Sequence, residues 1–210
     1  MCGSAKSAAR ARTALVIVDM QNDFVSPAGA MARFGFHAAD VQAIVAPLAA
    51  LLDAARRNGV AVFHTRMVND VRRNAPSWTA FWGEPAVTLP GSWGAEFVPE
   101  LTPLPTETVV EKYGYGAFFG TSLDTMLRAC GVDTIAVAGT GPNICSGDTM
   151  HQAFALGYHV VAVSDCLACF SRRGAAHSAT MKDVGLYVIE NHYGRVVTSR
   201  DLIAAWEGDR

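Results

Sequence analysis

The sequence predicts an α/β fold of three layers, in which a mainly parallel six-stranded sheet is doubly wound between helices. Two observations lead to this prediction. Short apolar runs typical of strands alternate with segments whose apolar residues recur at helical spacing. The strands are also apolar along their whole length, which is typical of a parallel sheet covered on both faces. Right-handed crossovers between such strands produce the doubly wound arrangement.

The first half of the chain predicts two strands and one helix. Residues 14–18 (ALVIV) form a short apolar strand that ends in Asp19. Apolar residues then recur at helical spacing over 41–55, and Gly59 lies where a C-terminal cap is expected. Residues 60–64 (VAVFH) form the second strand. Residues 66–106 lack periodicity and contain many Pro and Trp residues, which is typical of a functional loop or an insertion.

The second half alternates more regularly. A third strand over 108–110 leads to Lys112, and a C-terminal helix begins near Ser199. Between them we expect helices at 121–130, 146–156 and 171–183, with strands at 134–138 and 159–163. Residues 187–189 are predicted as a last strand, with Val196 and Val197 beside it.

Composition limits the classes of partner. Half of the 210 residues are hydrophobic, which is enough for a sizeable core, and 17 Lys and Arg against 19 Asp and Glu give a net charge of −2. This balance offers no electrostatic reason to expect nucleic acid or an anionic membrane as partner, and no apolar run reaches the roughly 18 residues of a membrane helix. We expect a flexible leader over 1–12, one domain over 13–208, and a cytoplasmic location. The five scattered cysteines are not typical of a disulfide framework.

Three reactive residues follow strands at their carboxyl ends, where ligand sites form in open parallel sheets. Asp19 ends the first strand, Lys112 ends the third, and Cys145 begins the helix after residues 134–138. A thiol at a helix N-terminus near a cation is shifted toward the thiolate. A nearby carboxylate can take the thiol proton and later return it to a leaving group. Each residue alone is more often structural, but together they indicate nucleophilic catalysis.

Three segments carry a family resemblance. LVIVDMQNDF (15–24), EKYGYGAFFGTSLDTML (111–127) and VAGTGPNICSGDTMHQAFALGYHVVAVSDC (137–166) resemble the isochorismatase-like cysteine hydrolases in order and spacing. The resemblance implies the corresponding three-layer fold and a catalytic triad of Asp19, Lys112 and Cys145. In this triad the thiolate attacks an amide or ureido carbonyl, Asp19 shuttles the proton, and Lys112 holds the thiolate and the carboxylate in place.

The resemblance also implies the geometry of the turn before Cys145. It places a cis peptide bond at Thr140–Gly141 and assigns the backbone amides of Gly141 and Cys145 to an oxyanion site. The chain departs from the family pattern at Pro142, where a threonine is common. Proline donates no N–H, so a hydrogen bond from that position is lost, which suggests an altered substrate.

Within the family, the segments GSWGAEFVPEL (91–101) and GAFFGTSLDTMLRACGV (116–132) resemble most the ureidoacrylate amidohydrolases, biuret hydrolases and N-carbamoylsarcosine amidases. Cys145 argues against the true isochorismatases, which lack this nucleophile. The chain also lacks the metal cluster of nicotinamidases, so we expect neither a metal nor another cofactor. The resemblance implies hydrolysis of a C–N bond in a small amide, carbamoyl or ureido compound through a thioester.

Alternatives remain open. A non-catalytic binding or scaffold protein on the same fold is one, and a hydrolase of a nicotinamide-like amide or an isochorismate-like ether is another. Cys166 and Cys169 form a CxxC pair that is either redox-active or simply two buried or loop thiols.

The expected substrate-binding side chains lie beside the triad segments or in the irregular region: Phe24, Asn22, Tyr115, Phe119, Trp78 and Trp82. Asn22 is equally suited to capping local backbone, and Trp78, Trp82 and Trp93 are equally compatible with a subunit interface. The resemblance implies a homo-oligomer, either a dimer or a tetramer. Arg66 and Arg72 are either ligands for a substrate carboxylate or solvated surface residues.

Overall fold

The computed structural model describes residues 12–83 and 86–208, so all of the expected leader except Arg12 lies outside the described residues. The predicted six-stranded sheet is confirmed, with strand order β3-β2-β1-β4-β5-β6, and every pair is parallel. The strands are β1 (Thr13–Val18), β2 (Ala61–Met67), β3 (Thr108–Lys112), β4 (Thr134–Thr140), β5 (His159–Ala168) and β6 (Gly194–Val197). Because β1 and β4 are neighbours, the strand order reverses between them, and a crevice forms there.

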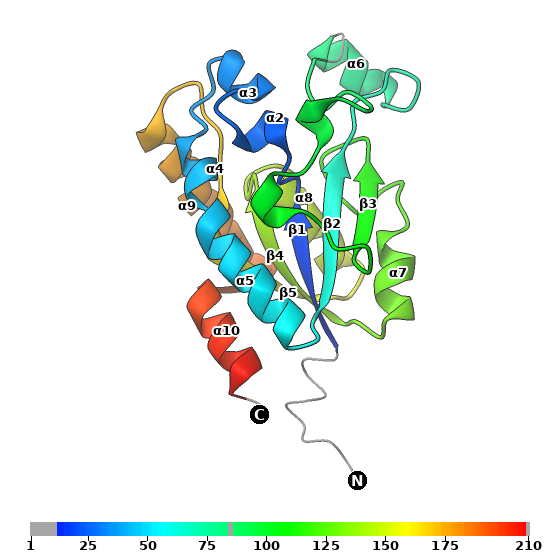
Figure 1. Cartoon of the computed structure of the whole chain (residues 1–210), viewed down its shortest axis with the longest axis vertical. Helices are drawn as coiled ribbons and strands as arrows, with labels where there is room; N and C mark the ends of the chain where they lie inside the picture. The colour runs from blue at the N-terminus through cyan, green and yellow to red at the C-terminus, as the bar shows by residue number, and fades with distance from the viewer. Residues whose placement is uncertain (1–11, 84–85, 209–210) are drawn as a thin grey trace.

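Helices cover both faces of the sheet (Figure 1). The helices are α2 (Asn22–Val25), α3 (Ala30–Arg33), α4 (Ala39–Ala43), α5 (Val45–Arg57), α6 (Pro76–Trp82), α7 (Leu123–Ala129), α8 (Cys145–Ala155), α9 (Ala175–His192) and α10 (Ser199–Glu207), with short 3-10 turns η1 (Trp93–Ala95) and η2 (Pro99–Leu101). Side chains of β1 alternate between two cores: Leu15 and Ile17 pack toward α5 and α10, whereas Val16 and Val18 pack toward α7, α8 and α9.

The prediction of a strand at residues 187–189 is wrong. These residues belong to α9, in which Tyr187 is 64% exposed and Ile189 is buried. The buried residues of α9 are Ser178, Gly185 and Ile189, and their spacings of seven and four are helical. The last strand is β6, which contains the predicted Val196 and Val197.

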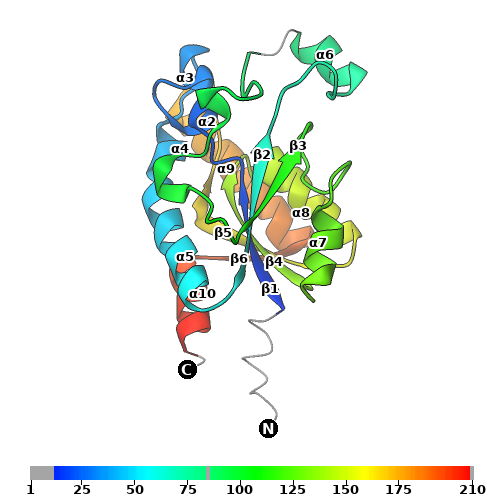
Figure 2. The same ribbon diagram turned by 45° about the vertical axis from the view of Figure 1, so that its right-hand side comes forward.

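The irregular region after β2 stands above the carboxyl ends of β2 and β3, where Figure 2 shows α6 raised from the sheet. Asp23, which is buried, fastens this region to the segment after β1. Its carboxylate accepts hydrogen bonds from the backbone amides of Thr88 (2.7 Å) and Ala30 (2.9 Å). The side chain of Asn69 adds a bond to the carbonyl of Val87 at 2.9 Å. The region is therefore tied to the sheet rather than loosely attached.

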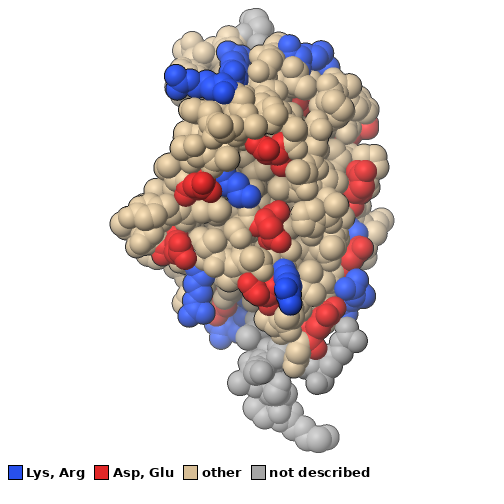
Figure 3. All heavy atoms as spheres, turned by 90° about the vertical axis from the view of Figure 1, so that its left-hand side faces the viewer, with Lys and Arg blue, Asp and Glu red and all other residues tan. Residues whose placement is uncertain are grey.

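The surface is mixed in charge on the face shown in Figure 3, where basic and acidic side chains are interspersed. No helix among the described residues is both long and apolar enough to span a membrane.

A buried polar network joins β2 to the segment before β3. Glu107 accepts hydrogen bonds from Arg56 at 2.8 and 3.0 Å and contacts Nε2 of His64 at 3.0 Å. Burial lowers the pKa of His64, although its hydrogen bond with Glu107 opposes this effect. The imidazole is therefore neutral at pH 7, and the ion pair of the network joins Glu107 and Arg56.

We expect the Glu107→Ala variant to lose about 1.5–3 kcal/mol of unfolding free energy, because it removes the charged hydrogen bonds from part-buried Arg56 and the partner of the buried His64 ring. Urea denaturation of the purified protein measures this loss. The matched control is Glu111→Ala, whose exposed pair with Arg66 spans 3.6 Å and is worth less than about 1 kcal/mol. Equal stability of the two variants would contradict this interpretation of the network.

Candidate active site

The structure brings Asp19, Lys112 and Cys145 together at the carboxyl edge of the sheet. Asp19 directly follows β1, and Cys145 is the first residue of α8, which follows β4. These two strands flank the point at which the strand order reverses. Lys112 is the last residue of β3, which is separated from β1 by β2. Its backbone therefore lies roughly 10 Å from β1, as two strand spacings require.

Asp19 is fully buried and adopts a left-handed backbone conformation with φ of +55°. Such a conformation is uncommon for residues other than glycine and concentrates at functional sites. Thr65 of β2 is the register partner of Val18 on β1, and it holds Asp19 in two ways. Its hydroxyl donates to Oδ1 of Asp19 at 2.6 Å and accepts a hydrogen bond from the Asp19 amide at 3.2 Å. The carboxylate therefore has a fixed orientation.

The Lys112 side chain crosses over β2 to reach this carboxylate. It passes Sδ of Met67, its register partner on β2, at 3.9 Å and places Nζ 2.7 Å from Oδ2 of Asp19. The ammonium also donates to the carbonyls of Gly114 (3.0 Å) and Tyr115 (2.7 Å). Two carbonyls thus accept hydrogen bonds from the ammonium, and the Asp19 carboxylate forms an ion pair with it.

The charge state of Lys112 follows from these contacts. Burial alone lowers its pKa, but interactions led by the charge of Asp19 together outweigh burial and raise it. The ammonium remains charged throughout the physiological pH range.

Cys145 is partly exposed and lies beside this ion pair. Burial of its sulfur raises the pKa to about 12, and the nearby Lys112 cation lowers it only in part, since the charge of Asp19 and a hydrogen bond with Asp19 raise it further. The expectation of a thiol shifted toward the thiolate is therefore wrong for the resting site. Desolvation and a neighbouring carboxylate outweigh one cation, and the site holds a neutral thiol next to a base.

The turn between β4 and α8 differs from the expectation in two respects. The Thr140–Gly141 peptide bond is trans, and Gly141 reverses the chain with φ of +64°, so the turn forms without the cost of a cis bond. The Gly141 amide donates to the carbonyl of Ala168 at 2.8 Å and is not free for a substrate oxygen. The Cys145 amide has no hydrogen-bond partner among the described residues.

A pocket of about 350 Å³ opens at Cys145. Four of the predicted substrate-binding residues line it, namely Phe24, Tyr115, Trp78 and Trp82, and Thr140 lines it as well. Trp78 and Trp82 come from α6, Phe24 from α2, and Tyr115 from the turn after Lys112.

Two of the residues predicted to bind substrate do not line the pocket at Cys145. Phe119 exposes 88% of its surface, because consecutive residues of the turns after β3 point in different directions. Asn22 is buried and donates through Nδ2 to the carbonyl of Trp93 at 2.9 Å, so it braces local backbone. Trp93 itself is half exposed and does not line the pocket.

Asn143, Phe170 and Arg172 are among the pocket residues that sequence reasoning missed. Arg172 is the one charged side chain among the described residues that line the pocket. The arginines singled out from the sequence pair elsewhere, Arg66 with Glu111 and Arg72 with Asp70. Phe170 and Arg172 follow β5, at the same carboxyl edge as Asp19, and this topological position was the available signal.

The two cysteines of the CxxC pair are both free and buried. Sγ of Cys169 donates to Oδ1 of Asn143 at 2.8 Å. This bond leaves the Nδ2 donors of Asn143 without a partner among the described residues. Burial raises the pKa of Cys166 to about 12 and that of Cys169 to about 11, so both are neutral thiols near pH 7.

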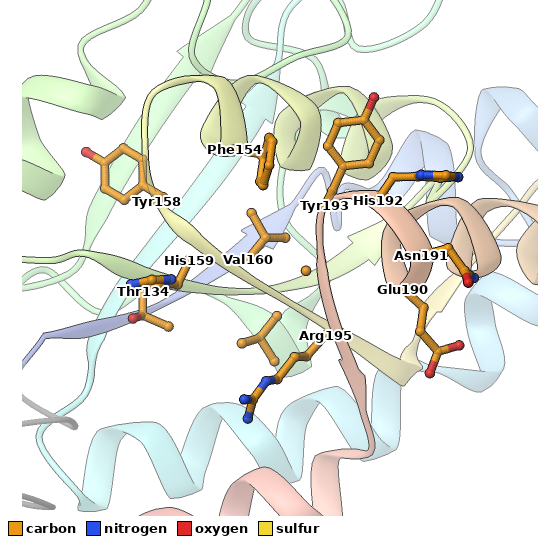
Figure 4. A pocket seen from close by; sticks show the side chains of 12 residues that line it. Thr134, Phe154, Tyr158, His159, Val160, Glu190, Asn191, His192, Tyr193 and Arg195 are labelled. Carbon is orange, nitrogen blue, oxygen red and sulfur yellow. The ribbon is translucent and has the colours of Figure 1, made fainter.

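A larger hollow of about 600 Å³ lies at the opposite edge, where Thr134 and His159 begin β4 and β5. In Figure 4 the polar ends of Tyr158, Glu190 and Arg195 point away from one another. Since no reactive groups converge among the described residues that line this hollow, the pocket at Cys145 is the candidate site.

Comparisons with known proteins show the family of the chain. The family model described as "Isochorismatase domain" matches residues 13–201 of this chain. The ureidoacrylate amidohydrolase of Variovorax paradoxus is 29% identical over 92% of this chain and 81% of its own. A cysteine hydrolase from Pseudomonas syringae pv. phaseolicola superposes with a TM-score of 0.86 at 31% identity, over 96% of this chain and 95% of that one. N-carbamoylsarcosine amidase from Thermoplasma acidophilum gives 0.73 at 28% identity, over 90% and 96%.

The reactivity of Cys145 tests the electrostatics of the site. We expect Asp19→Asn to speed alkylation of Cys145 by iodoacetamide several-fold at neutral pH, because the Asp19 carboxylate raises the thiol pKa. Lys112→Met removes the cation that lowers this pKa, so it slows alkylation. Peptide mass spectrometry gives the rate at each cysteine.

Exposed Cys130 is the internal control, and its rate stays the same in all variants. A slower reaction at Cys145 in Asp19→Asn would show that the carboxylate activates the resting thiol instead of suppressing its ionisation.

Proposed function

The chain belongs to the isochorismatase family, and from this premise we propose that it is a cysteine-dependent amidohydrolase. Its reaction is hydrolysis of a C–N bond in a small amide, carbamoyl or ureido compound through a thioester. The observation that carries the proposal is the thiol of Cys145, which lines a pocket and lies beside the buried ion pair of Asp19 and Lys112, whose charged atoms are 2.7 Å apart. A nucleophile, a base and a fixed cation are thereby combined in one site.

In the first half-reaction the thiol proton passes to Asp19 as the sulfur bonds to the substrate carbonyl carbon. The carbonyl electrons move to oxygen and form a tetrahedral oxyanion. When this collapses, the C–N bond breaks and Asp19 returns the proton to the departing nitrogen, which leaves as ammonia or an amine. The second half-reaction uses water. Asp19 takes a proton from water, the resulting hydroxide attacks the thioester, and the proton returns to sulfur as the C–S bond breaks.

Lys112 supports both halves without exchanging its own protons. The ion pair with Asp19 and the hydrogen bonds to two carbonyls hold the ammonium in one position. From there its charge favours the developing thiolate. The unpartnered amide of Cys145 is the donor assigned to the oxyanion, and the Nδ2 group of Asn143 is available as a second.

Arg172 supports a substrate that carries an anionic group. It supplies the one cation among the described residues that line the pocket, and its guanidinium lies over the ring of Phe36 at 4.5 Å. A carboxylate is the group that a guanidinium binds best in a planar, bidentate manner. Ureido acids and N-carbamoyl amino acids combine this group with a scissile C–N bond.

We expect Cys145→Ala to abolish ammonia release in a screen of small amides, ureido acids, biuret and nicotinamide. Asp19→Asn and Lys112→Met lower kcat by at least about a thousandfold, as for other members of a catalytic group that acts as a unit. Denaturing mass spectrometry of the wild type during turnover is expected to detect an acyl adduct on Cys145.

The control Cys130→Ser retains activity, because Cys130 is exposed and does not line the pocket. Turnover retained in Cys145→Ala would refute the covalent mechanism.

Replacing Arg172 by Met tests the anionic substrate. Loss of a charged hydrogen bond worth about 1.5–3 kcal/mol raises KM for an N-carbamoyl amino acid by about tenfold to a hundredfold. The KM of a neutral amide stays unchanged. Arg173→Met is the matched control, because Arg173 is exposed but outside the pocket. Equal effects of the two variants would contradict the assignment.

A further inference from the structure

The pocket at Cys145 has aromatic walls on both sides of the sulfur. Tyr115 follows β3, whereas Phe170 follows β5, and these strands lie on opposite sides of the β1–β4 crevice. Cys145 follows β4 and therefore lies between the two. A bound molecule whose carbonyl meets the sulfur must place the rest of its body against one or both walls.

The first wall is fixed to the catalytic lysine. The rings of Trp78 and Tyr115 have centroids 4.7 Å apart, and Nε1 of Trp82 donates to the Tyr115 hydroxyl at 3.0 Å. The carbonyl of the same tyrosine accepts a hydrogen bond from Lys112 at 2.7 Å. The three rings are thus held in place before any ligand binds, which lowers the entropy cost of binding.

The second wall joins segments distant in sequence. Phe24 of α2 packs against Phe170 with ring centroids 6.0 Å apart, and the guanidinium of Arg172 covers the ring of Phe36. All four residues line the pocket. Around the same opening, Phe34 and Ile144 expose 46% and 43% of their surfaces. Apolar surface left exposed around a reactive group is typical of a ligand-binding cleft.

We propose that the pocket selects carbamoyl or carboxamide compounds that carry an aromatic or similarly bulky apolar body. This inference rests on the proposed function and names its substrate class. The volume of about 350 Å³ falls within the roughly 300–1,000 Å³ of pockets for drug-sized ligands. A small, wholly polar ureido acid leaves most of the aromatic surface in contact with water, whereas an aryl group removes it from water.

The test compares two substrates with the same reacting group and the same carboxylate, N-carbamoylphenylalanine (each enantiomer) and N-carbamoylglycine. Ammonia release gives kcat/KM, and protection of Cys145 against iodoacetamide gives pocket occupancy without turnover. We expect one phenylalanine enantiomer to be preferred by at least about tenfold, the scale on which apolar pockets discriminate. Trp78→Ala reduces this ratio about tenfold. Phe119→Ala, with its exposed ring outside the pocket, is the control and leaves the ratio unchanged.

The two proposals fail in different ways. The apolar substrate class is overturned if neither phenylalanine enantiomer protects Cys145 from iodoacetamide better than the glycine compound does. This holds even if all of these compounds release ammonia. Stronger protection by one phenylalanine enantiomer, lost in Trp78→Ala, supports that class. If protection is seen without ammonia release from any amide or ureido compound, the proposed hydrolytic function is refuted instead.

Discussion

The ion pair between Lys112 and Asp19 is the constraint on which the rest of the site depends. Both side chains are fully buried, and a charge removed from water is tolerated only when its hydrogen-bonding capacity is met by the protein. This requirement explains why the Thr65 hydroxyl donates a hydrogen bond to Asp19 and why two carbonyls accept hydrogen bonds from Lys112. The lysine must also stand at its present position in β3, because a lysine one residue earlier would point to the other face of the sheet.

This pair connects the chemistry to the pocket. The turn after β3 presents two carbonyls to Lys112, and one of them belongs to Tyr115, whose ring forms part of the aromatic wall. The wall and the lysine therefore share Tyr115 as a common contact. The opposite wall depends on the ends of β1 and β5, so the position of a substrate is set by strands on both sides of the crevice.

Much of the fold was predictable because buried parallel strands are continuous apolar runs, as in residues 14–18 and 134–138. Residues 187–189 were not, since three residues are too few to distinguish the strand period from the helical one. The convergence of Asp19, Lys112 and Cys145 followed from their places at strand ends. The neutral state of the Cys145 thiol and the hydrogen bond of the Gly141 amide could not be predicted in this way, because both depend on burial and on partners distant in sequence.

The central claim is that Asp19 and Cys145 share one proton, which rests on sulfur while Lys112 remains charged. The ultraviolet absorbance of the thiolate, titrated in the wild type and in Cys145→Ser, tests this claim directly. A neutral resting thiol predicts that the difference between the two proteins shows no thiolate at neutral pH and that the signal appears only in strongly alkaline solution. A full thiolate signal of Cys145 at neutral pH would contradict it, because the proton would then already have left the sulfur before any substrate binds.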